Sequence, residues 1–568
     1  MRQILTRPFR LPRLKAYVPE PDDPAIFWFN SEREDIIREV VRRIVERYGG
    51  DRESLEYALN EVAFHETRRL EQQRDDEARD QLGYWRGLLR RIARMSDNAK
   101  RDALRGITER MAKDIAGNFD PRVYKFSTVV APQLLTGVMR PSSLPKELAT
   151  AGLGTRALDE MLTTEGEIEL LRKLERMGTL IYVPTHASNL DSIALGYALQ
   201  RSGLAPVVYG AGKNLFTNPI ISFFMHNLGA YRVDRRVKAS LYKNVLKTYS
   251  AVLIERGYHS LFFPGGTRSR SGMVERRLKL GLAGTGVEAF ARNQVFGIRR
   301  PVWFVPATIN YAIVMEAETL IEDHLKEAGQ ARYIIEDDEF SRIDRWVAFF
   351  RKLVGTDGAC VIRFARPLDP FGNPVDDEGR SVAPGGKIVD PGTYVMRHGK
   401  PVIDAKRDAA YTRELGETIL DVYKHETVLM GTQLVAHVLF RRLVRETPGV
   451  DLFGRLRFRG EIRMTRAELV ADIGATRDRA AELEARGEVH LSHFVRKRPP
   501  DEILDRAMAQ WDGYHTRTVA RQIGPDVIAE DPTLLLYYQN RLVDYATAVA
   551  SERDAAAARE IALLGVVR

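Results

Sequence analysis

The chain has 568 residues, which predicts two to four domains at roughly 150 residues per domain. Hydrophobic residues make up 44% and charged residues 29%, the balance of a globular protein with a sizeable core. The net charge of +9 suits nucleic acid, an anionic membrane surface or a phosphorylated substrate, so it does not choose between them. Nowhere do about 18 apolar residues follow one another, so no transmembrane helix is predicted.

A single cysteine, Cys360, excludes an internal disulfide and fits a cytosolic or cytosol-facing protein. It falls within a strand pattern, so we expect it to be a core residue. The first residues, Met1 to Tyr17, are rich in arginine but contain no apolar stretch of the length a signal peptide needs.

Helical patterns dominate the first part of the chain. Ser31 and Glu34 have the S-x-x-E spacing of a capping box, and apolar residues at helical spacing follow as far as Gly49. Further helical patterns cover 52–72, 78–95 and 98–116. We therefore predict a helical N-terminal region over residues 1–140.

The pattern then changes to short β-rich runs, separated by helical patterns such as 238–256. The runs predicted to be strands are 179–184, 205–210, 230–234, 259–264, 302–310 and 360–365. This alternation predicts an α/β domain over 141–370. Residues 371–407 lie in a stretch rich in Gly, Pro and Asp and are expected to form loops or hairpins. Helical patterns return over 408–568, which we predict to be a helical C-terminal region.

A histidine and an aspartate follow the strand pattern at 179–184. Because open α/β sheets bind ligands at strand ends, His186 is well placed to face a ligand. Asp191, in the first turn of the next helix, can contact one ring nitrogen of His186, fix its tautomer and leave the other nitrogen as a base. The nucleophile would be a hydroxyl of the substrate. The alternative is a histidine that ends a strand and an aspartate that caps a helix.

A second set of polar residues follows the strand pattern at 259–264. Two glycines, Gly265 and Gly266, free the backbone for a close approach to a ligand. Guanidinium groups bind phosphate oxygens in a bidentate manner, so the two arginines that follow predict a phosphate site. The predicted binding residues are Gly266, Thr267, Arg268, Ser269 and Arg270. The alternative is a solvated polar loop.

Two further basic residues follow strand patterns between these sets. Lys213 comes after the run at 205–210 and Arg235 after the run at 230–234. Both can add positive charge to the same pocket, although basic residues in such positions are also common on protein surfaces.

Taken in chain order, these segments resemble the four motif blocks of the glycerolipid acyltransferase superfamily. The H-x4-D block matches His186 and Asp191. The second block matches Gly229, Tyr231 and Arg235, the third, usually F-P-E-G-T-R-S, matches residues 263–269, and the fourth matches 305–311. The resemblance covers about residues 175–365. It implies a central acyltransferase domain with a mixed β-sheet flanked by helices, with helical regions before and after it.

One position departs from the superfamily pattern. The glutamate usual in the third block is Gly265 in this chain, so a role for that glutamate cannot be carried over. Soluble glycerol-3-phosphate acyltransferases of plastids are similar in having a Gly-Gly-Arg-x-Arg form without it. The two arginines therefore look like the part that the reaction requires.

The regions outside the blocks favour one branch of the superfamily. Lysophosphatidate acyltransferases are typically little more than the α/β domain, whereas this chain has long helical regions on both sides. Residues 428–436 also resemble a segment of the larger bacterial and mitochondrial glycerol-3-phosphate acyltransferases. The resemblance therefore implies a glycerol-3-phosphate acyltransferase, with a lysophosphatidate acyltransferase as the alternative.

The resemblance also implies a mechanism and its partners. His186 would take the proton of the 1-hydroxyl of glycerol 3-phosphate, with Asp191 orienting the ring, and acyl-CoA or acyl-carrier protein would supply the acyl group. Arg235, Arg268, Arg270 and Lys213 would hold the phosphate. No cofactor is implied, and the histidines show no spacing typical of a metal site. Peripheral contact with the membrane, at the cytoplasmic face, is expected from the chemistry of the product.

Two other interpretations remain open. Residues 464–492 superficially resemble a winged-helix unit, but acidic residues run through them and leave no clean basic face, so we do not expect nucleic acid binding. Gly265 raises a second alternative, a superfamily member that is inactive or uses another acceptor.

Overall fold

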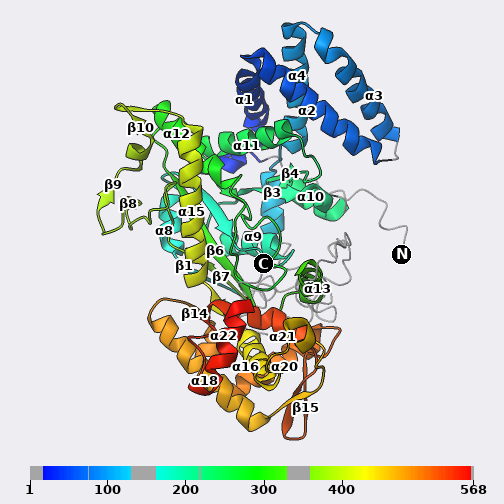
Figure 1. The fold of residues 1–568 in the computed structure, drawn as a ribbon. Coiled ribbons are helices and arrows are strands. Elements are labelled where there is room, and N and C mark those ends of the chain that lie inside the picture. The colour runs from blue at the N-terminus through cyan, green and yellow to red at the C-terminus, as the bar shows by residue number, and fades with distance from the viewer. Residues whose placement is uncertain (1–16, 74–75, 129–160, 217–218, 329–358, 565–568) are drawn as a thin grey trace.

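The computed structural model describes residues 17–73, 76–128, 161–216, 219–328 and 359–564. Helices of the N-terminal region (blue) lie at one end of an elongated molecule, a sheet with its helices lies in the middle, and the C-terminal helices (orange and red) lie at the other end (Figure 1). The long helix α15 (Ala405–His425) runs along the middle part toward the C-terminal helices (Figure 1).

Four long α-helices lie in the described part of the N-terminal region, as the apolar spacing predicts. They are α1 (Phe29–Gly49), α2 (Arg52–Glu71), α3 (Asp76–Arg91) and α4 (Asp97–Ile115). Helices α2 and α4 begin where the side chains of Asp51 and Ser96 accept backbone N–H groups of the first turn. Their buried faces pack on one another and on α11 (Ser240–Glu255) of the middle part.

The predicted capping box at Ser31 is wrong. Helix α1 begins at Phe29, and the Ser31 hydroxyl donates back to the carbonyl of Trp28 instead of capping the helix. Phe29 is only 1% exposed, and its ring packs edge-on against Tyr258 with centroids 5.5 Å apart. Burial of this aromatic side chain extends the helix past the local capping signal.

A seven-stranded sheet forms the middle of the molecule, in the order β1-β7-β6-β2-β5-β3-β4. The strands are β1 (Leu162–Gly166), β2 (Thr179–Pro184), β3 (Val208–Gly212), β4 (Ala230–Val233), β5 (Ser260–Leu261), β6 (Val302–Tyr311) and β7 (Cys360–Phe364). Strands β6 and β7 are antiparallel and all other neighbours are parallel, so the sheet is mixed, as predicted. Every residue of β2 and β6 is buried, so these strands lie at the centre of the core.

The sequence patterns locate most strands but miss one and misplace the ends of two. Strand β1 is only partly buried, pairs on one side alone and reads Leu-Thr-Thr-Glu-Gly, so it has no apolar run to detect. Strand β3 begins at Val208 rather than 205, because Pro206 has no N–H for the ladder. Strand β5 has only two residues, and the chain after it turns at Gly265 and Gly266.

The helices of the middle part alternate with these strands, as the α/β pattern predicts. They are α8 (Ile168–Leu174), α9 (Asp191–Arg201), α10 (Pro219–Asn227), α11, α12 (Ala283–Val295) and α13 (Ala317–Ala328), with a 3-10 turn η3 (Lys213–Phe216). None of the helices in the described ranges has the length and hydropathy that crossing a bilayer requires. Cys360 is buried in β7, which confirms it as a core residue.

The predicted loop and hairpin segment contains hairpins, as expected, and the region after it is mainly helical but includes short strands that the sequence does not predict. Short hairpins β8–β9 (Ser381–Val382, Ile388–Val389) and β10–β11 (Met396–Arg397, Lys400–Pro401) lie in the predicted loop segment. Helices after α15 are α16 (Gly431–Glu446), α17 (Leu452–Arg455), α18 (Arg466–Ala485), α19 (His493–Lys497), α20 (Pro500–Tyr514), α21 (Pro532–Gln539) and α22 (Ala555–Leu564). The added strands are β12 (Val428–Leu429), β13 (Ile462–Thr465), β14 (His490–Leu491), β15 (Ala520–Ile523) and β16 (Asp526–Ala529).

The packing crosses the predicted boundaries of the regions. One continuous core joins the sheet to α16, α18, α20 and α21, and a second joins the N-terminal helices to β3, β4 and α11. Each neighbouring region shares its apolar core with the sheet, so the cores do not mark where one domain ends and the next begins. The division at residues 140, 370 and 407 stays a prediction.

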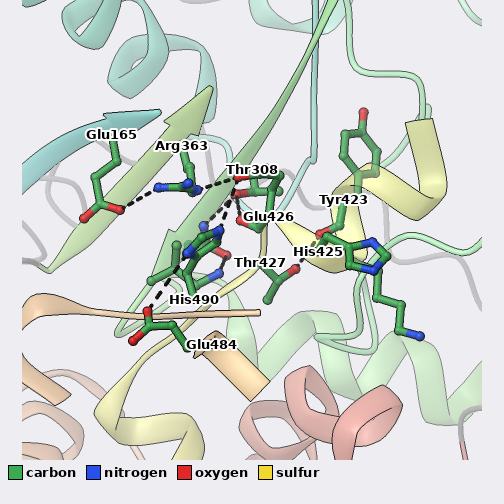
Figure 2. Close-up of polar contacts among 12 residues, drawn as sticks. Glu165, Thr308, Arg363, Tyr423, His425, Glu426, Thr427, Glu484 and His490 are labelled. Carbon is green, nitrogen blue, oxygen red and sulfur yellow. Dashed lines mark hydrogen bonds and ion pairs between the residues drawn. The ribbon is translucent and has the colours of Figure 1, made fainter. Parts of the chain in front are cut away.

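A chain of charged side chains also ties the sheet to the C-terminal helices (Figure 2). Arg363 of β7 contacts Glu165 of β1 at 3.3 Å and hydrogen-bonds Glu426, and Nε2 of His490 lies 3.5 Å from Glu426. The backbone carbonyl of Glu426 accepts the Thr308 hydroxyl at 2.6 Å. Burial acts to raise the pKa of Glu426, but His490 and Arg363 outweigh it and the pKa is lowered.

Replacing Arg363 with Met is expected to reduce the free energy of unfolding by about 1–3 kcal/mol, since it leaves partly buried carboxylates without their cation. Because the folded-state pKa of Glu426 is lowered, this stabilisation exists above the unfolded pKa and is lost as pH falls through the folded pKa. Urea unfolding at neutral and acidic pH tests both points. Arg38→Met, which breaks an exposed pair with Asp35, is the control and is expected to change stability little. Equal effects of the two substitutions would contradict the prediction.

Candidate active site

Three strand ends bring the candidate residues to one edge of the sheet. His186 follows β2, and the segment from Phe263 to Ser271 follows β5, which pairs with β2. Tyr311 ends β6, which pairs with β2 on its other side. Because parallel strands present their carboxyl ends at the same edge, these side chains converge there, as the strand patterns predict.

The His186 ring contacts the Asp191 carboxylate, as the H-x4-D spacing predicts. Nδ1 of His186 lies 2.7 Å from Oδ2 of Asp191, and α9 begins at Asp191. Because the ionised carboxylate can only accept, this contact requires the hydrogen on Nδ1 and leaves Nε2 with a free lone pair. The His186 side chain is 16% exposed, so a substrate hydroxyl can reach it from solvent. The Phe263 ring stacks on the imidazole, with centroids 4.2 Å apart.

The Asp191 side chain is fully buried and is held by four donors. In addition to His186, Oδ2 accepts the backbone N–H groups of Ala187 at 2.7 Å and Ser188 at 3.0 Å. Oδ1 accepts the Tyr311 hydroxyl at 2.9 Å. This network fixes the turn after β2 and therefore fixes the direction in which His186 points.

The turn after β5 is tied to the histidine through the backbone. The N–H of Ser269 donates to the carbonyl of His186 at 2.7 Å, and the Ser269 hydroxyl donates to the carbonyl of Met273 at 2.8 Å. Gly266 has a φ of +75°, and an added Cβ there would lie 2.4 Å from Cδ of Lys279. The positive φ explains why glycine occupies this position, since the flexible end of the Lys279 side chain could move away from a Cβ. Thr267 is exposed.

The structure places the predicted cations in different surroundings. Arg268 contacts buried Glu316 at 3.1 Å, beside the Asp191 loop. Arg270 pairs with Glu327 of α13, and Lys213 with Asp114 of α4 at 3.2 Å. Two of the four predicted cations are thus drawn toward carboxylates on neighbouring helices.

Arg235 lies at the rim of the same edge. The surrounding chain partly desolvates its guanidinium although the residue keeps substantial exposure, and this desolvation lowers the pKa of Arg235. The positive charge of Arg268 lowers the pKa further. The charge of Arg268 is felt at Arg235, so these two guanidiniums are candidates to bind an anion together.

Sequence reasoning missed several residues around the site. Glu316 accepts the Ser188 hydroxyl and the Asn189 N–H, both at 2.9 Å, as well as Arg268. Burial raises the pKa of Glu316, and the charge of Arg268 is the main opposing effect. No motif marks Glu316, which follows β6 at the same edge as Tyr311. Its position after a strand end is the signal in the sequence that could have identified Glu316 as a site residue.

The C-terminal region also contributes to the site. A small cavity is lined by Ala187, Ser269, Tyr311, Gln433, Tyr537 and Arg541. Arg541 is only 7% exposed and donates weakly to the carbonyl of Ile309 at 3.5 Å. Arg541 lies far from the other site residues in the sequence, so no local sequence pattern could link it to them. Among the described residues, no group of three His, Cys, Asp or Glu side chains is arranged to hold a metal ion.

The chain resembles known proteins over part of its length. Residues 166–310 match the Acyltransferase family model. This segment is therefore similar to an acyltransferase domain. This agrees with the resemblance of the motif blocks to the glycerolipid acyltransferase superfamily.

Part of the chain is similar to proteins named glycerol-3-phosphate acyltransferase. The protein of Histophilus somni strain 129Pt is 35% identical over 157 residues, 27% of this chain and 19% of that protein. The protein of Pseudomonas aeruginosa strain PAO1 is 28% identical over 227 residues, 40% of this chain and 24% of that protein. The matched segments thus span less than a quarter of the length of these curated relatives. A solved structure, the 1-acyl-sn-glycerophosphate acyltransferase of Thermotoga maritima, aligns over 45% of this chain and 85% of its own at 18% identity, with a TM-score of 0.23.

Proposed function

We propose that the chain transfers a fatty acyl group from a thioester to the 1-hydroxyl of glycerol 3-phosphate, giving lysophosphatidate. The observation that carries the proposal is the 2.7 Å contact between His186 and Asp191 at the same sheet edge as Arg268. A base for a hydroxyl and a cation for a phosphate are the two groups that this acceptor needs. The names of the curated relatives support the same acceptor.

The proposed reaction needs one base and no covalent enzyme intermediate. Nε2 of His186 takes the hydroxyl proton while the hydroxyl oxygen attacks the thioester carbonyl carbon. The C–S bond then breaks, and the thiolate of CoA or acyl-carrier protein takes the proton back from the imidazolium. Asp191 stabilises the imidazolium through Nδ1, and the fixed loop places the base against the acceptor.

In this proposal the phosphate binds at the rim formed by Arg235 and Arg268. The Glu316 carboxylate positions Arg268, so the guanidinium is held before the phosphate arrives. Thr267 is exposed on the same turn and can add its hydroxyl, whereas the N–H groups of Gly266 and Ser269 and the Ser269 hydroxyl already donate within the protein. Arg270 and Lys213 take part only if a phosphate draws them from Glu327 and Asp114.

We further propose that the protein works at the cytoplasmic face of the membrane as a peripheral enzyme. The acyl chain of the product partitions into lipid, which favours work at a membrane surface. Helix α10 carries Phe223, Phe224 and Met225, all only partly buried, and leads away from the 3-10 turn at Lys213.

The central test offers purified protein labelled glycerol 3-phosphate or lysophosphatidate, with acyl-CoA and acyl-carrier protein as donors. Lysophosphatidate is expected from glycerol 3-phosphate. His186→Ala is expected to lower kcat by about 100- to 10,000-fold, the usual contribution of a general base. Transfer to lysophosphatidate alone would reassign the acceptor, and transfer to neither would reject the proposal.

Arginine substitutions test the phosphate site. Arg235→Gln and Arg268→Gln are each expected to raise KM for glycerol 3-phosphate by about 10- to 100-fold, as loss of a hydrogen bond to a charged group does. Arg236→Gln is the matched control, because Arg236 is exposed and pairs with Asp234. An unchanged KM in both site variants, or an equal rise in the control, would place the phosphate elsewhere.

Flotation of the full chain with vesicles containing phosphatidylglycerol tests the membrane proposal. Phe224→Glu is expected to reduce the bound fraction several-fold, because it puts a charge on the face that would enter the lipid. Phe296→Glu, at a side chain that is 62% exposed beyond the end of α12, serves as the control. Wild-type protein that stays with the soluble fraction would overturn this proposal.

A further inference from the structure

The glycine at position 265 leaves a space that another residue fills. A Cβ added to Gly265 would lie 3.3 Å from Cγ of Glu275 and 3.6 Å from its Oε1. Gly265 is not among the residues with positive φ, so its backbone does not require glycine. The side chain of Glu275 therefore occupies the volume that a side chain at 265 would need.

The Glu275 carboxylate contacts the proposed base through the backbone. Its Oε1 accepts the N–H of His186 at 2.6 Å. On the other side of the same residue, the His186 carbonyl accepts the N–H of Ser269, and the ring is held by Asp191. Both backbone polar groups and one ring nitrogen of His186 thus have fixed partners.

Burial of this carboxylate is costly, which argues that the contact matters. Oε2 of Glu275 is buried and accepts no hydrogen bond from the described residues. Burial raises the pKa of Glu275, while the His186 N–H and the charge of Arg541 oppose the rise. An unpaired buried oxygen is a cost that the rest of the fold must offset.

The distances fit an exchange between the two positions. In a glutamate, two C–C bonds of about 1.5 Å and one C–O bond of about 1.25 Å put the carboxylate oxygens at most roughly 3.6 Å from Cβ. A glutamate at 265 can therefore bring one oxygen to the point where Oε1 of Glu275 now lies. The usual third motif block has its glutamate at this position, where the chain has Gly265.

We propose that Glu275 is a positioning residue that supplies, from ten positions further along the chain, the carboxylate that the third motif block lacks at Gly265. It acts through the backbone of His186 and does not touch the substrate. The expected effect on kcat rests on the proposed function. The replacement of one carboxylate by another concerns the fold alone and does not depend on that function.

The kinetic test compares Glu275→Ala, Glu275→Gln, Gly265→Glu and the double variant Gly265→Glu/Glu275→Ala. Glu275→Ala is expected to lower kcat by about 10- to 100-fold with KM for the acceptor nearly unchanged, because a misplaced base affects chemistry more than binding. Glu275→Gln keeps an oxygen that accepts the His186 N–H, so it is expected to retain most of kcat. Gly265→Glu alone is expected to lower kcat, since two side chains then compete for one space.

The double variant tests directly whether a carboxylate at 265 can replace that of Glu275. Recovery of kcat to within about threefold of wild type is expected, because the glutamate at 265 then occupies the vacated position. Losses that multiply in the double variant would overturn the inference, as would a Glu275→Gln variant as slow as Glu275→Ala. Glu414→Ala, an exposed carboxylate on α15, is the control for unspecific effects.

A readout that does not depend on the acceptor separates this inference from the proposed function. Urea unfolding of the same variants is expected to show lower midpoints for Glu275→Ala and Gly265→Glu and a recovered midpoint for the double variant. If wild type transfers no acyl group to either acceptor, the proposed function fails and the unfolding cycle still tests the exchange. Additive losses of stability would overturn it.

Discussion

The site depends on a single buried charge, the carboxylate of Asp191. An ionised group away from water is tolerated only when nearby donors replace its hydration. Asp191 obtains them from the imidazole, two backbone N–H groups and the Tyr311 hydroxyl. These donors come from the turn after β2 and from the end of β6, so solvating one carboxylate also fixes the spacing of two neighbouring strands. The orientation of the imidazole follows from that requirement.

The positive charges of the site are balanced in unequal ways. Lys213 and Arg270 pair with carboxylates on helices, whereas Arg235 shares its rim with Arg268. Glu316 offsets Arg268 from the buried side. Arg235 and Arg268 are thus the two predicted cations that lie near enough for the charge of one to lower the pKa of the other.

Local sequence patterns predicted those elements that are determined by residues close together in the chain. Apolar periodicity predicted α2, α4, β2 and β6 to within a residue or two, and the five-residue spacing between His186 and Asp191 predicted a contact that the fold forms. The start of α1 was predicted wrongly because Phe29 is held by Tyr258, far along the chain. Strand β1 was missed because its pairing with β7, and not its composition, makes it a strand.

The same reasoning explains which site residues the sequence did not reveal. Glu275, Glu316 and Arg541 have no motif of their own, and each becomes part of the site only through the fold. Arg541 is the extreme case, because it lies more than 300 residues from His186 in the chain. Tertiary packing brings such residues to the site, and rules based on spacing along the sequence cannot detect it.

The attachment of the C-terminal helices to the sheet has a consequence for inherited variation. The Tyr423 hydroxyl donates to the carbonyl of Val183, three residues before His186, and the Thr432 hydroxyl donates to the carbonyl of Ala312, next to Tyr311. Loosening the C-terminal helices therefore removes support from the strand ends that position His186 and Tyr311. In a cell, a core substitution in α16 or α21 would reduce the amount of competent protein and resemble, in a genetic screen, a substitution of His186, the proposed base.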